Sequence, residues 1–120
     1  MPDMTSSVIE RDRRRAVAAV PALQPGQYLA VEDGDTMSVI PVAAEVTKIG
    51  RAIAADIRLD DRTVSRKHAR LVRREDGICI LDDRSMNGVF VNDERVSERV
   101  LRDGDTVMLG RVRMRFISVI

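Results

Sequence analysis

Short runs of alternating apolar and polar residues, separated by turn-forming residues, make up most of the chain from Gln27 onward. Runs of this length with a period of two are typical of β-strands. The expected strands are residues 28–31, 37–42, 46–49, 57–59, 69–72, 78–81, 89–91, 107–109 and 112–117. Many short strands with no amphipathic helix pattern between them predict an all-β fold, an antiparallel β-sandwich.

Turn signals lie between these runs and indicate where the chain reverses. Asp33-Gly34-Asp35 separates the first two expected strands, and Asp76-Gly77, Asn87-Gly88 and Asp103-Gly104 follow later runs. Asn-Gly and Asp-Gly pairs favour tight turns because both positions tolerate positive φ. By itself, each of these pairs predicts a turn and nothing more.

The first 26 residues differ from the rest, and we expect a flexible N-terminal tail and linker there, followed by one domain at residues 27–120. Residues 1–9 are small and polar without periodicity, and residues 10–15 are a run of charges. A helix over residues 10–20 would be only marginally stable in water at that length. The apolar stretch before Pro21 is too short for a secretory signal.

Composition narrows the classes of function. The 120 residues are 44% hydrophobic and 32% charged, which suits a folded core, and the net charge is only +1. That balance argues against nucleic acid as the partner, since coating nucleic acid needs a basic excess. We also expect no membrane partner, because no apolar run is long enough to span a bilayer. The single Cys79 cannot form an internal disulfide, which fits a cytoplasmic protein.

The sequence gives no support for a zinc site, a serine-hydrolase triad or a nucleotide-binding loop. One histidine and one cysteine are too few for a zinc site. Ser65 and His68 lie too close in sequence for a usual catalytic triad, and no G-x-S-x-G motif is present. No glycine-rich nucleotide loop occurs either. We therefore expect neither an enzyme nor a cofactor.

Basic and hydroxyl side chains gather instead in expected loops, where binding residues usually lie. They occur at Gly50-Arg51, in residues 63–69 and in residues 85–88. Together they are the donors that a phosphate on a peptide requires. Taken singly, each has an ordinary explanation: a surface arginine, a serine that caps a turn, a buried structural histidine and an Asn-Gly turn.

The order and spacing of these motifs closely resemble those of the forkhead-associated (FHA) domain over about residues 47–117. In chain order the matching motifs are Gly50-Arg51, Asp56-Ile57-Arg58-Leu59-Asp60-Asp61, Thr63-Val64-Ser65-Arg66-Lys67-His68-Ala69, Leu81-Asp82-Asp83, Ser85-Met86-Asn87-Gly88, Val91-Asn92, Leu101, Asp103-Gly104-Asp105 and Leu109-Gly110. The resemblance implies an FHA-type sandwich of two twisted antiparallel sheets. It also implies that loops at one end bind phosphothreonine peptides.

The same resemblance implies a role for each binding residue. It places Arg51 against the phosphate and makes Ser65 the hydroxyl donor to a phosphate oxygen. The resemblance also implies that Arg66 contacts the phosphate or the peptide backbone, and that Asn87 binds the main chain of the peptide. Met86 departs from the family, which commonly has a hydroxyl residue there. Backbone amides of that loop would then have to compensate, or Met86 would contact residues that flank the phosphothreonine.

Three further residues are implied to be structural. Gly50 and Gly88 would permit tight backbone turns, and His68 would brace the loops. The expected function is a non-enzymatic adaptor or regulator in serine/threonine kinase signalling. Its partners would be phosphothreonine proteins and a serine/threonine kinase. The alternative is a phosphorylation-independent interaction domain on the same fold.

The tail supports a second expectation. Residues 5–9 resemble the phosphorylatable tail of short bacterial FHA regulators, which share this layout of a tail and a single domain. The resemblance implies that a kinase phosphorylates Thr5 and that the domain then binds its own tail. A flexible linker of about 20 residues spans roughly 25 Å, which is enough to reach loops on a small domain.

Overall fold

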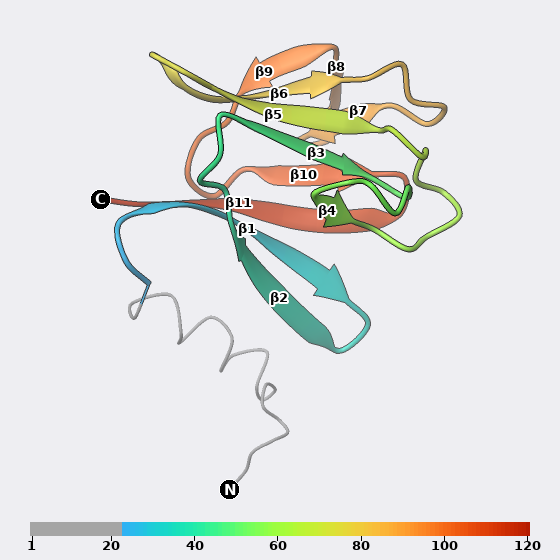
Figure 1. The fold of residues 1–120 in the computed structure, drawn as a ribbon, viewed down its shortest axis with the longest axis horizontal. Coiled ribbons are helices and arrows are strands. Elements are labelled where there is room, and N and C mark those ends of the chain that lie inside the picture. Colours follow the sequence, from blue (N-terminus) through green and yellow to red (C-terminus); the bar gives the residue numbers. More distant parts are fainter. Residues whose placement is uncertain (1–22) are drawn as a thin grey trace, which may run out of the picture.

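The computed structural model describes residues 23–120, which form two β-sheets packed face to face (Figure 1). The strands are β1 (Gly26–Asp33), β2 (Thr36–Pro41), β3 (Val46–Gly50), β4 (Ile57–Arg58), β5 (Ala69–Arg74), β6 (Gly77–Asp82), β7 (Val89–Val91), β8 (Glu94–Val96), β9 (Glu98–Val100), β10 (Thr106–Leu109) and β11 (Val112–Val119). The six-stranded sheet has the order β2-β1-β11-β10-β7-β8, and the five-stranded sheet has the order β4-β3-β5-β6-β9. The predicted all-β sandwich is confirmed.

The core lies between the sheets and is built almost entirely from aliphatic side chains. In β10 and β11, buried Val107, Leu109, Met114 and Phe116 alternate with more exposed neighbours, so one face of each strand points inward. The five-stranded sheet contributes Ile49, Leu71, Ile78 and Ile80 to the same cluster. Each such side chain contributes roughly 1.5–3 kcal/mol when it leaves water. The alternation in the sequence is thus the cause of the sandwich.

Most strand pairs are antiparallel, as expected, but β3 and β4 pair in parallel. The pairing joins Ile49 to Ile57 and Gly50 to Arg58, and the Leu59 amide donates to the Gly50 carbonyl oxygen at 2.9 Å. The expectation of purely antiparallel sheets is therefore wrong at this edge. The loop at residues 51–56 carries the chain back so that β4 starts beside the end of β3.

Two strands, β8 and β9, were not predicted from the sequence because most of their residues are charged. Each places two charged residues before one valine, and both lie at an edge of a sheet. Charged edge strands are common because they discourage pairing with another chain. Asn92 and Asp93, with φ of 51° and 71°, form the tight turn between β7 and β8.

The predicted tail lies mostly outside the described residues, and Thr5 lies outside them as well. The first strand begins at Gly26, one residue before the expected start of the domain. In the described range, 23–120, no helix is long and apolar enough to cross a membrane.

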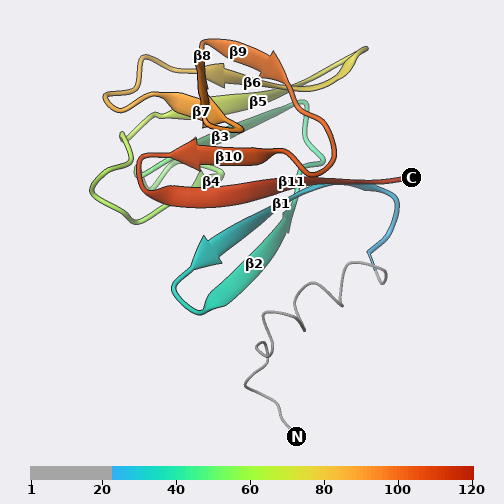
Figure 2. The ribbon, with the colours of Figure 1, turned by 180° about the vertical axis from the view of Figure 1, so that it is seen from behind.

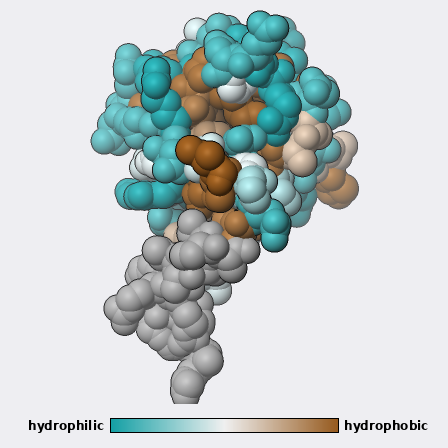
Figure 3. Space-filling view, turned by 90° about the vertical axis from the view of Figure 1, so that its left-hand side faces the viewer, coloured by the Kyte–Doolittle hydropathy of each residue, from teal (hydrophilic) through white to brown (hydrophobic). Residues whose placement is uncertain are grey.

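Four loops meet at one end of the sandwich, on the right in Figure 1 and on the left in Figure 2. They are the β3–β4, β4–β5, β6–β7 and β10–β11 connections, which come from both sheets. The opposite end, which includes the C-terminus, shows hydrophobic atoms surrounded by a mainly hydrophilic surface (Figure 3). The loop end holds all the described residues that the sequence analysis selected for binding.

Candidate functional site

The β3–β4 and β4–β5 loops lie side by side and share backbone hydrogen bonds. The Arg51 amide donates to the Ser65 carbonyl oxygen at 3.0 Å, and the Ala52 amide donates to the Arg66 carbonyl oxygen at 3.1 Å. A Cβ atom on Gly50 would overlap the Arg66 carbonyl oxygen. Gly50 therefore permits this close approach of the two loops, a role that the sequence did not indicate.

The side chain of Arg51 is held in place by one of its own donors. Its Nε–H donates to the Val64 carbonyl oxygen at 3.0 Å, and the side chain is half-buried. Arginine carries five N–H donors in a planar fork. The two terminal nitrogens of the guanidinium, Nη1 and Nη2, carry the other four N–H donors and are free for another acceptor, such as a phosphate.

His68 lies in the protein interior and bridges two loops. It is 0% exposed, and its Nδ1 accepts a hydrogen bond from the Ser65 amide at 3.0 Å. A backbone amide can only donate, so the ring proton sits on Nε2, which donates to the Gly88 carbonyl oxygen at 2.8 Å. The ring thereby fixes the β4–β5 loop against the β6–β7 loop.

Ser65 and Asn87 also connect these loops through their side chains. The Ser65 hydroxyl oxygen accepts from the Met86 amide at 2.9 Å, and Asn87 Nδ2 donates to the Thr63 carbonyl oxygen at 2.7 Å. These contacts leave the Ser65 hydroxyl proton free to donate. They also leave free the second N–H of the Asn87 side-chain amide and its Oδ1. Each side chain is positioned by one polar group and keeps another for a ligand.

The β6–β7 loop has fewer free backbone amide donors than the sequence led us to expect. The Met86 amide is already engaged by Ser65, and the Gly88 amide donates to Ser85 Oγ at 2.9 Å. Neither amide can replace the hydroxyl group that Met86 lacks. The Met86 side chain is 83% exposed, so it faces outward at the site. Gly88 has a φ of 89°, which a residue with a side chain rarely adopts.

Thr63 is a central residue of the site to which sequence reasoning assigned no role. Its amide and its hydroxyl both donate to Asp61 Oδ1, at 2.8 and 2.5 Å, and the hydroxyl accepts from the Arg111 amide at 2.8 Å. These hydrogen bonds from Thr63 hold the pKa of Asp61 below its usual value. The Asp-x-Thr spacing was the available signal, because Asp side chains often bond the amide two residues later.

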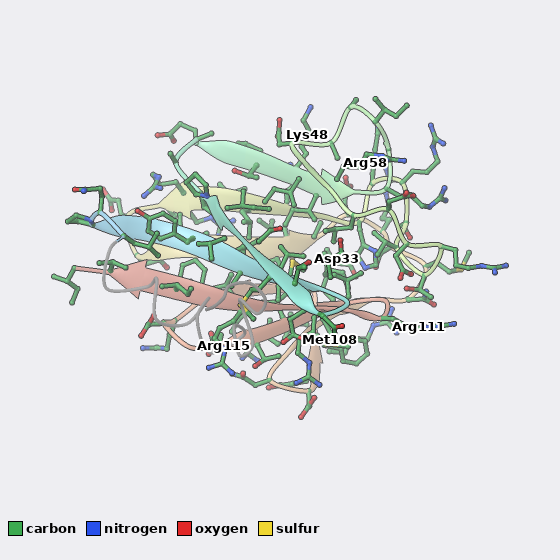
Figure 4. All side chains as sticks on the ribbon, turned by 90° about the horizontal axis from the view of Figure 1, so that it is seen from below. Asp33, Lys48, Arg58, Met108, Arg111 and Arg115 are labelled. Atoms are coloured by element: carbon green, nitrogen blue, oxygen red, sulfur yellow. The ribbon has the colours of Figure 1, made fainter. Side chains whose placement is uncertain are left out.

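Further cations surround the loops. Arg66 and Lys67 are exposed, and both line a recess beside the β3–β4 loop. Arg58 donates from Nε to the Arg51 carbonyl oxygen at 3.0 Å. Figure 4 shows Arg58 and Arg111 on opposite sides of this end of the molecule. Neither arginine was among the binding residues predicted from the sequence.

The fold and this site define a class of protein: a two-sheet sandwich that presents arginine, hydroxyl and amide groups from loops at one end. Residues 47–110 match the family model of the FHA domain. The chain belongs to the FHA domain family. The first two strands precede the matched residues and complete the six-stranded sheet.

Among curated proteins, the chain is 37% identical over 105 residues to the glycogen accumulation regulator GarA of Mycobacterium tuberculosis. The alignment covers 86% of this chain and 65% of GarA, so the chain spans about two-thirds of that relative. A solved FHA domain with phosphothreonine-dependent interactions is 30% identical, with a TM-score of 0.68, over 76% of this chain and 94% of that chain. Mycobacterium tuberculosis EmbR, solved with a low-affinity phosphopeptide, is 34% identical, with a TM-score of 0.71, over 83% of this chain and 26% of EmbR.

Proposed function

We propose that this FHA domain reads phosphothreonine in partner proteins and acts as a non-enzymatic adaptor or regulator in cytoplasmic serine/threonine kinase signalling. The observation that carries the proposal is the arrangement of Arg51, Ser65 and Asn87. Each uses one polar group to hold its place and leaves another for a ligand. The phosphopeptide bound to EmbR and the regulatory name of GarA support the same function.

The chemistry of the ligand matches these groups. A phosphothreonine carries about −1.5 to −2 charges at pH 7 and three strong acceptor oxygens. The free guanidinium nitrogens of Arg51 suit two of those oxygens, because the planar fork binds phosphate in a bidentate way. The Ser65 hydroxyl donates to a phosphate oxygen, and the Asn87 amide holds the peptide main chain. Arg66 adds a second cation, and Met86 contacts residues that flank the phosphothreonine.

Calorimetric titration of an oriented phosphothreonine peptide library tests the proposal. Arg51→Ala should weaken binding by about 2–5 kcal/mol, because a charged hydrogen-bonded partner of the phosphate is lost. Ser65→Ala and Asn87→Ala should also weaken it while the domain stays folded. Arg70→Ala is a matched control, since Arg70 is an exposed arginine in β5 and pairs with Leu81 on the sheet. Absence of binding to the wild-type chain would show that the proposed function is wrong.

A phosphorylation-independent interaction is the alternative, and one observation favours it. Ile53 and Met86, on two of the site loops, are 88% and 83% exposed. Exposed large apolar side chains beside a binding site suit a partner with an apolar surface. Equal affinity for the phosphorylated and unphosphorylated forms of the same peptide would select this alternative.

We further propose that the binding domain comprises residues 27–120. A kinase phosphorylates Thr5 in the preceding tail, and the domain then binds the phosphorylated Thr5. A tether raises the effective concentration to about the millimolar range, so modest affinity suffices. Phosphorylation of Thr5 should then shift the amide resonances of Ser65 and Asn87 by the same amount at every protein concentration. Shifts that disappear on dilution, or that persist in a Thr5→Ala chain treated with the kinase, would contradict this proposal.

A further inference from the structure

Aromatic side chains are scarce in this chain, and most of them lie outside the core. The sequence has one tyrosine, two phenylalanines and no tryptophan. Phe116 belongs to the buried cluster between the sheets, whereas Tyr28 and Phe90 are partly exposed. Protein interfaces are enriched in Tyr, Phe, Met and Arg relative to the rest of the surface. The surface that carries these two rings is therefore a candidate interface.

Both rings lie on the solvent side of the six-stranded sheet. Tyr28 on β1 alternates with residues of the buried cluster, and so do Met108 on β10 and Phe90 on β7. Because successive side chains of a strand point to opposite faces, these three point outward. The solvent side of β2, β1, β11, β10 and β7, which we call the outer face, also carries Arg113 and Arg115. It lies in front in Figure 2, and Figure 4 shows Met108 and Arg115 on the same side of the sandwich.

Charges of both signs lie in the middle of the outer face. Arg113 and Arg115 are exposed on β11, and the ion pairs found among residues 23–120 involve other arginines. Glu32 is exposed on the neighbouring strand β1. It follows Val31, which pairs with Met114, so Glu32 and Arg113 are the next neighbours in the β1–β11 register. The outer face thus joins apolar groups with one acidic and two basic groups that a second molecule can reach.

Two copies of the outer face are complementary when a two-fold axis runs along the strands, between β1 and β11. Such an axis places β1 of one copy over β11 of the other, and each contact occurs twice. Glu32 of each copy then faces Arg113 of the other. Met37 pairs with Glu32 on the sheet and Met108 pairs with Arg113, so Met37 faces Met108 between the copies. An axis across the strands would instead place the two arginine-bearing β11 strands over each other, which repulsion opposes.

The size of this contact indicates how stable the dimer is. Four strands of each copy take part, and both β1 and β11 have eight residues. Strands lie about 4.8 Å apart and rise about 3.3 Å per residue, so the footprint is roughly 20 Å by 26 Å. Two such footprints bury roughly 1,000 Å² before the relief of the side chains is counted, which is at the lower end for specific interfaces. We therefore expect a reversible dimer that forms at micromolar concentrations and not an obligate one.

We propose that this chain forms a two-fold dimer through the outer face, with Glu32 of each copy paired to Arg113 of the other. Because the axis runs along the strands, the loop ends of both copies point in the same direction. The dimer thus presents two of the proposed phosphothreonine sites side by side and suits a partner with two phosphothreonines. That use rests on the proposed function, whereas the dimer itself needs no phosphate.

Sedimentation equilibrium of the full, unphosphorylated chain tests the inference. Between roughly 1 μM and 1 mM, the average mass should rise from that of a monomer toward that of a dimer. Arg113→Glu and Glu32→Arg each place like charges in both contacts, so each should lower the association constant at least roughly tenfold. Arg70→Glu is the matched control, because it makes the same charge reversal at an exposed position of the other sheet and should change nothing.

Mixing the two single variants separates contacts between chains from contacts within one chain. Each variant alone carries like charges at residues 32 and 113, both within the chain and across the dimer. In an equimolar mixture of Glu32→Arg and Arg113→Glu, opposite charges face each other in both contacts between the chains. The mixture should therefore associate as the wild type does, although each variant alone is monomeric. Circular dichroism of each variant confirms that it is folded.

The outcomes distinguish this inference from the proposed function. A wild-type chain that stays monomeric up to about 1 mM overturns the dimer. So does a dimer that both charge reversals leave unchanged, or a mixture that fails to associate. Arg113→Glu should bind a phosphopeptide as the wild type does, since Arg113 lies on β11 and outside the loops of the site. If no phosphopeptide binds to any chain, the proposed function is wrong and the dimer stands.

Discussion

His68→Ala removes a buried ring that joins two loops of the site. In the wild-type chain, Nδ1 accepts from the Ser65 amide and Nε2 donates to the Gly88 carbonyl oxygen, and the side chain is 0% exposed. The substitution leaves both backbone groups without this partner and leaves a space where the ring stood. It should therefore reduce both the stability of the domain and the affinity for a phosphopeptide.

The two losses can be estimated from the contacts. Each buried backbone group that loses its partner costs about 1–3 kcal/mol, and the empty space adds a further term. The terms overlap, because the loops relax partly into the space, so we expect a total of about 3–4 kcal/mol. Small domains are stable by only about 5–15 kcal/mol, so the variant should remain folded but with a much lower midpoint of unfolding.

Urea unfolding followed by circular dichroism measures the change, since the chain contains no tryptophan for fluorescence. Val64→Ala is the control: Val64 is 1% exposed in the same loop, and its truncation costs about 1.5–3 kcal/mol without removing a loop-to-loop hydrogen bond. His68→Gln keeps one amide donor and one acceptor, so its unfolding free energy should lie between those of His68→Ala and Val64→Ala. Phosphopeptide titrations are then run far below every unfolding midpoint.

The expected result is that His68→Ala weakens phosphopeptide binding, whereas Val64→Ala, which is also destabilised, binds as the wild type does. If His68→Ala costs less than about 1 kcal/mol in unfolding free energy, the buried hydrogen bonds carry little weight and the reasoning fails. Equal binding by the two variants would show that the ring supports the fold alone and does not position the loops.

The remaining predictions concern the same loops and their ligand. Gly50→Ala should leave the chain largely unfolded, because its Cβ would overlap the Arg66 carbonyl oxygen; a cooperative unfolding curve like that of the wild type would contradict this. The contribution of Asp61 to stability is present at neutral pH and lost as the pH falls below about 4, because its folded-state pKa is lowered. In Thr63→Val, the Asp61 titration seen by nuclear magnetic resonance should move up toward 3.8, and an unchanged midpoint would refute the assignment. Phosphopeptide affinity should fall as the pH drops through about 6, where the phosphate gains its second proton, and a flat calorimetric profile across that range would argue against recognition of the dianion.

The sequence predicted the fold wherever one face of a strand is buried. β10 and β11 show the alternation clearly, because apolar side chains that point inward alternate with residues that face out. β8 and β9 have no such signal, since their edge positions are held by backbone hydrogen bonds and tolerate charged residues. The parallel pairing of β4 could not be predicted either, because it depends on how the preceding loop folds back.

Much of the site could be named from the sequence, but its internal connections could not. Resemblance selected Arg51, Ser65 and Asn87 by their position in motifs, which carries no information on what each contacts within the protein. Thr63 was missed because its importance lies in tertiary contacts to Arg111 and Asn87, which are remote in sequence. The close approach at Gly50 was not predicted because contact between two loops leaves no local pattern.

These internal contacts matter because they limit what binding has to order. Ser65, His68 and Asn87 already tie the β4–β5 and β6–β7 loops together before a ligand arrives. Side chains that are fixed in advance lose less conformational entropy on binding, so more of each contact appears as affinity. The Ser65 oxygen that accepts from the Met86 amide keeps its proton available as a donor. The hydrogen bond from the Met86 amide therefore orients the Ser65 hydroxyl toward the proposed phosphate position. This orientation partly compensates for the side-chain donor that Met86 lacks.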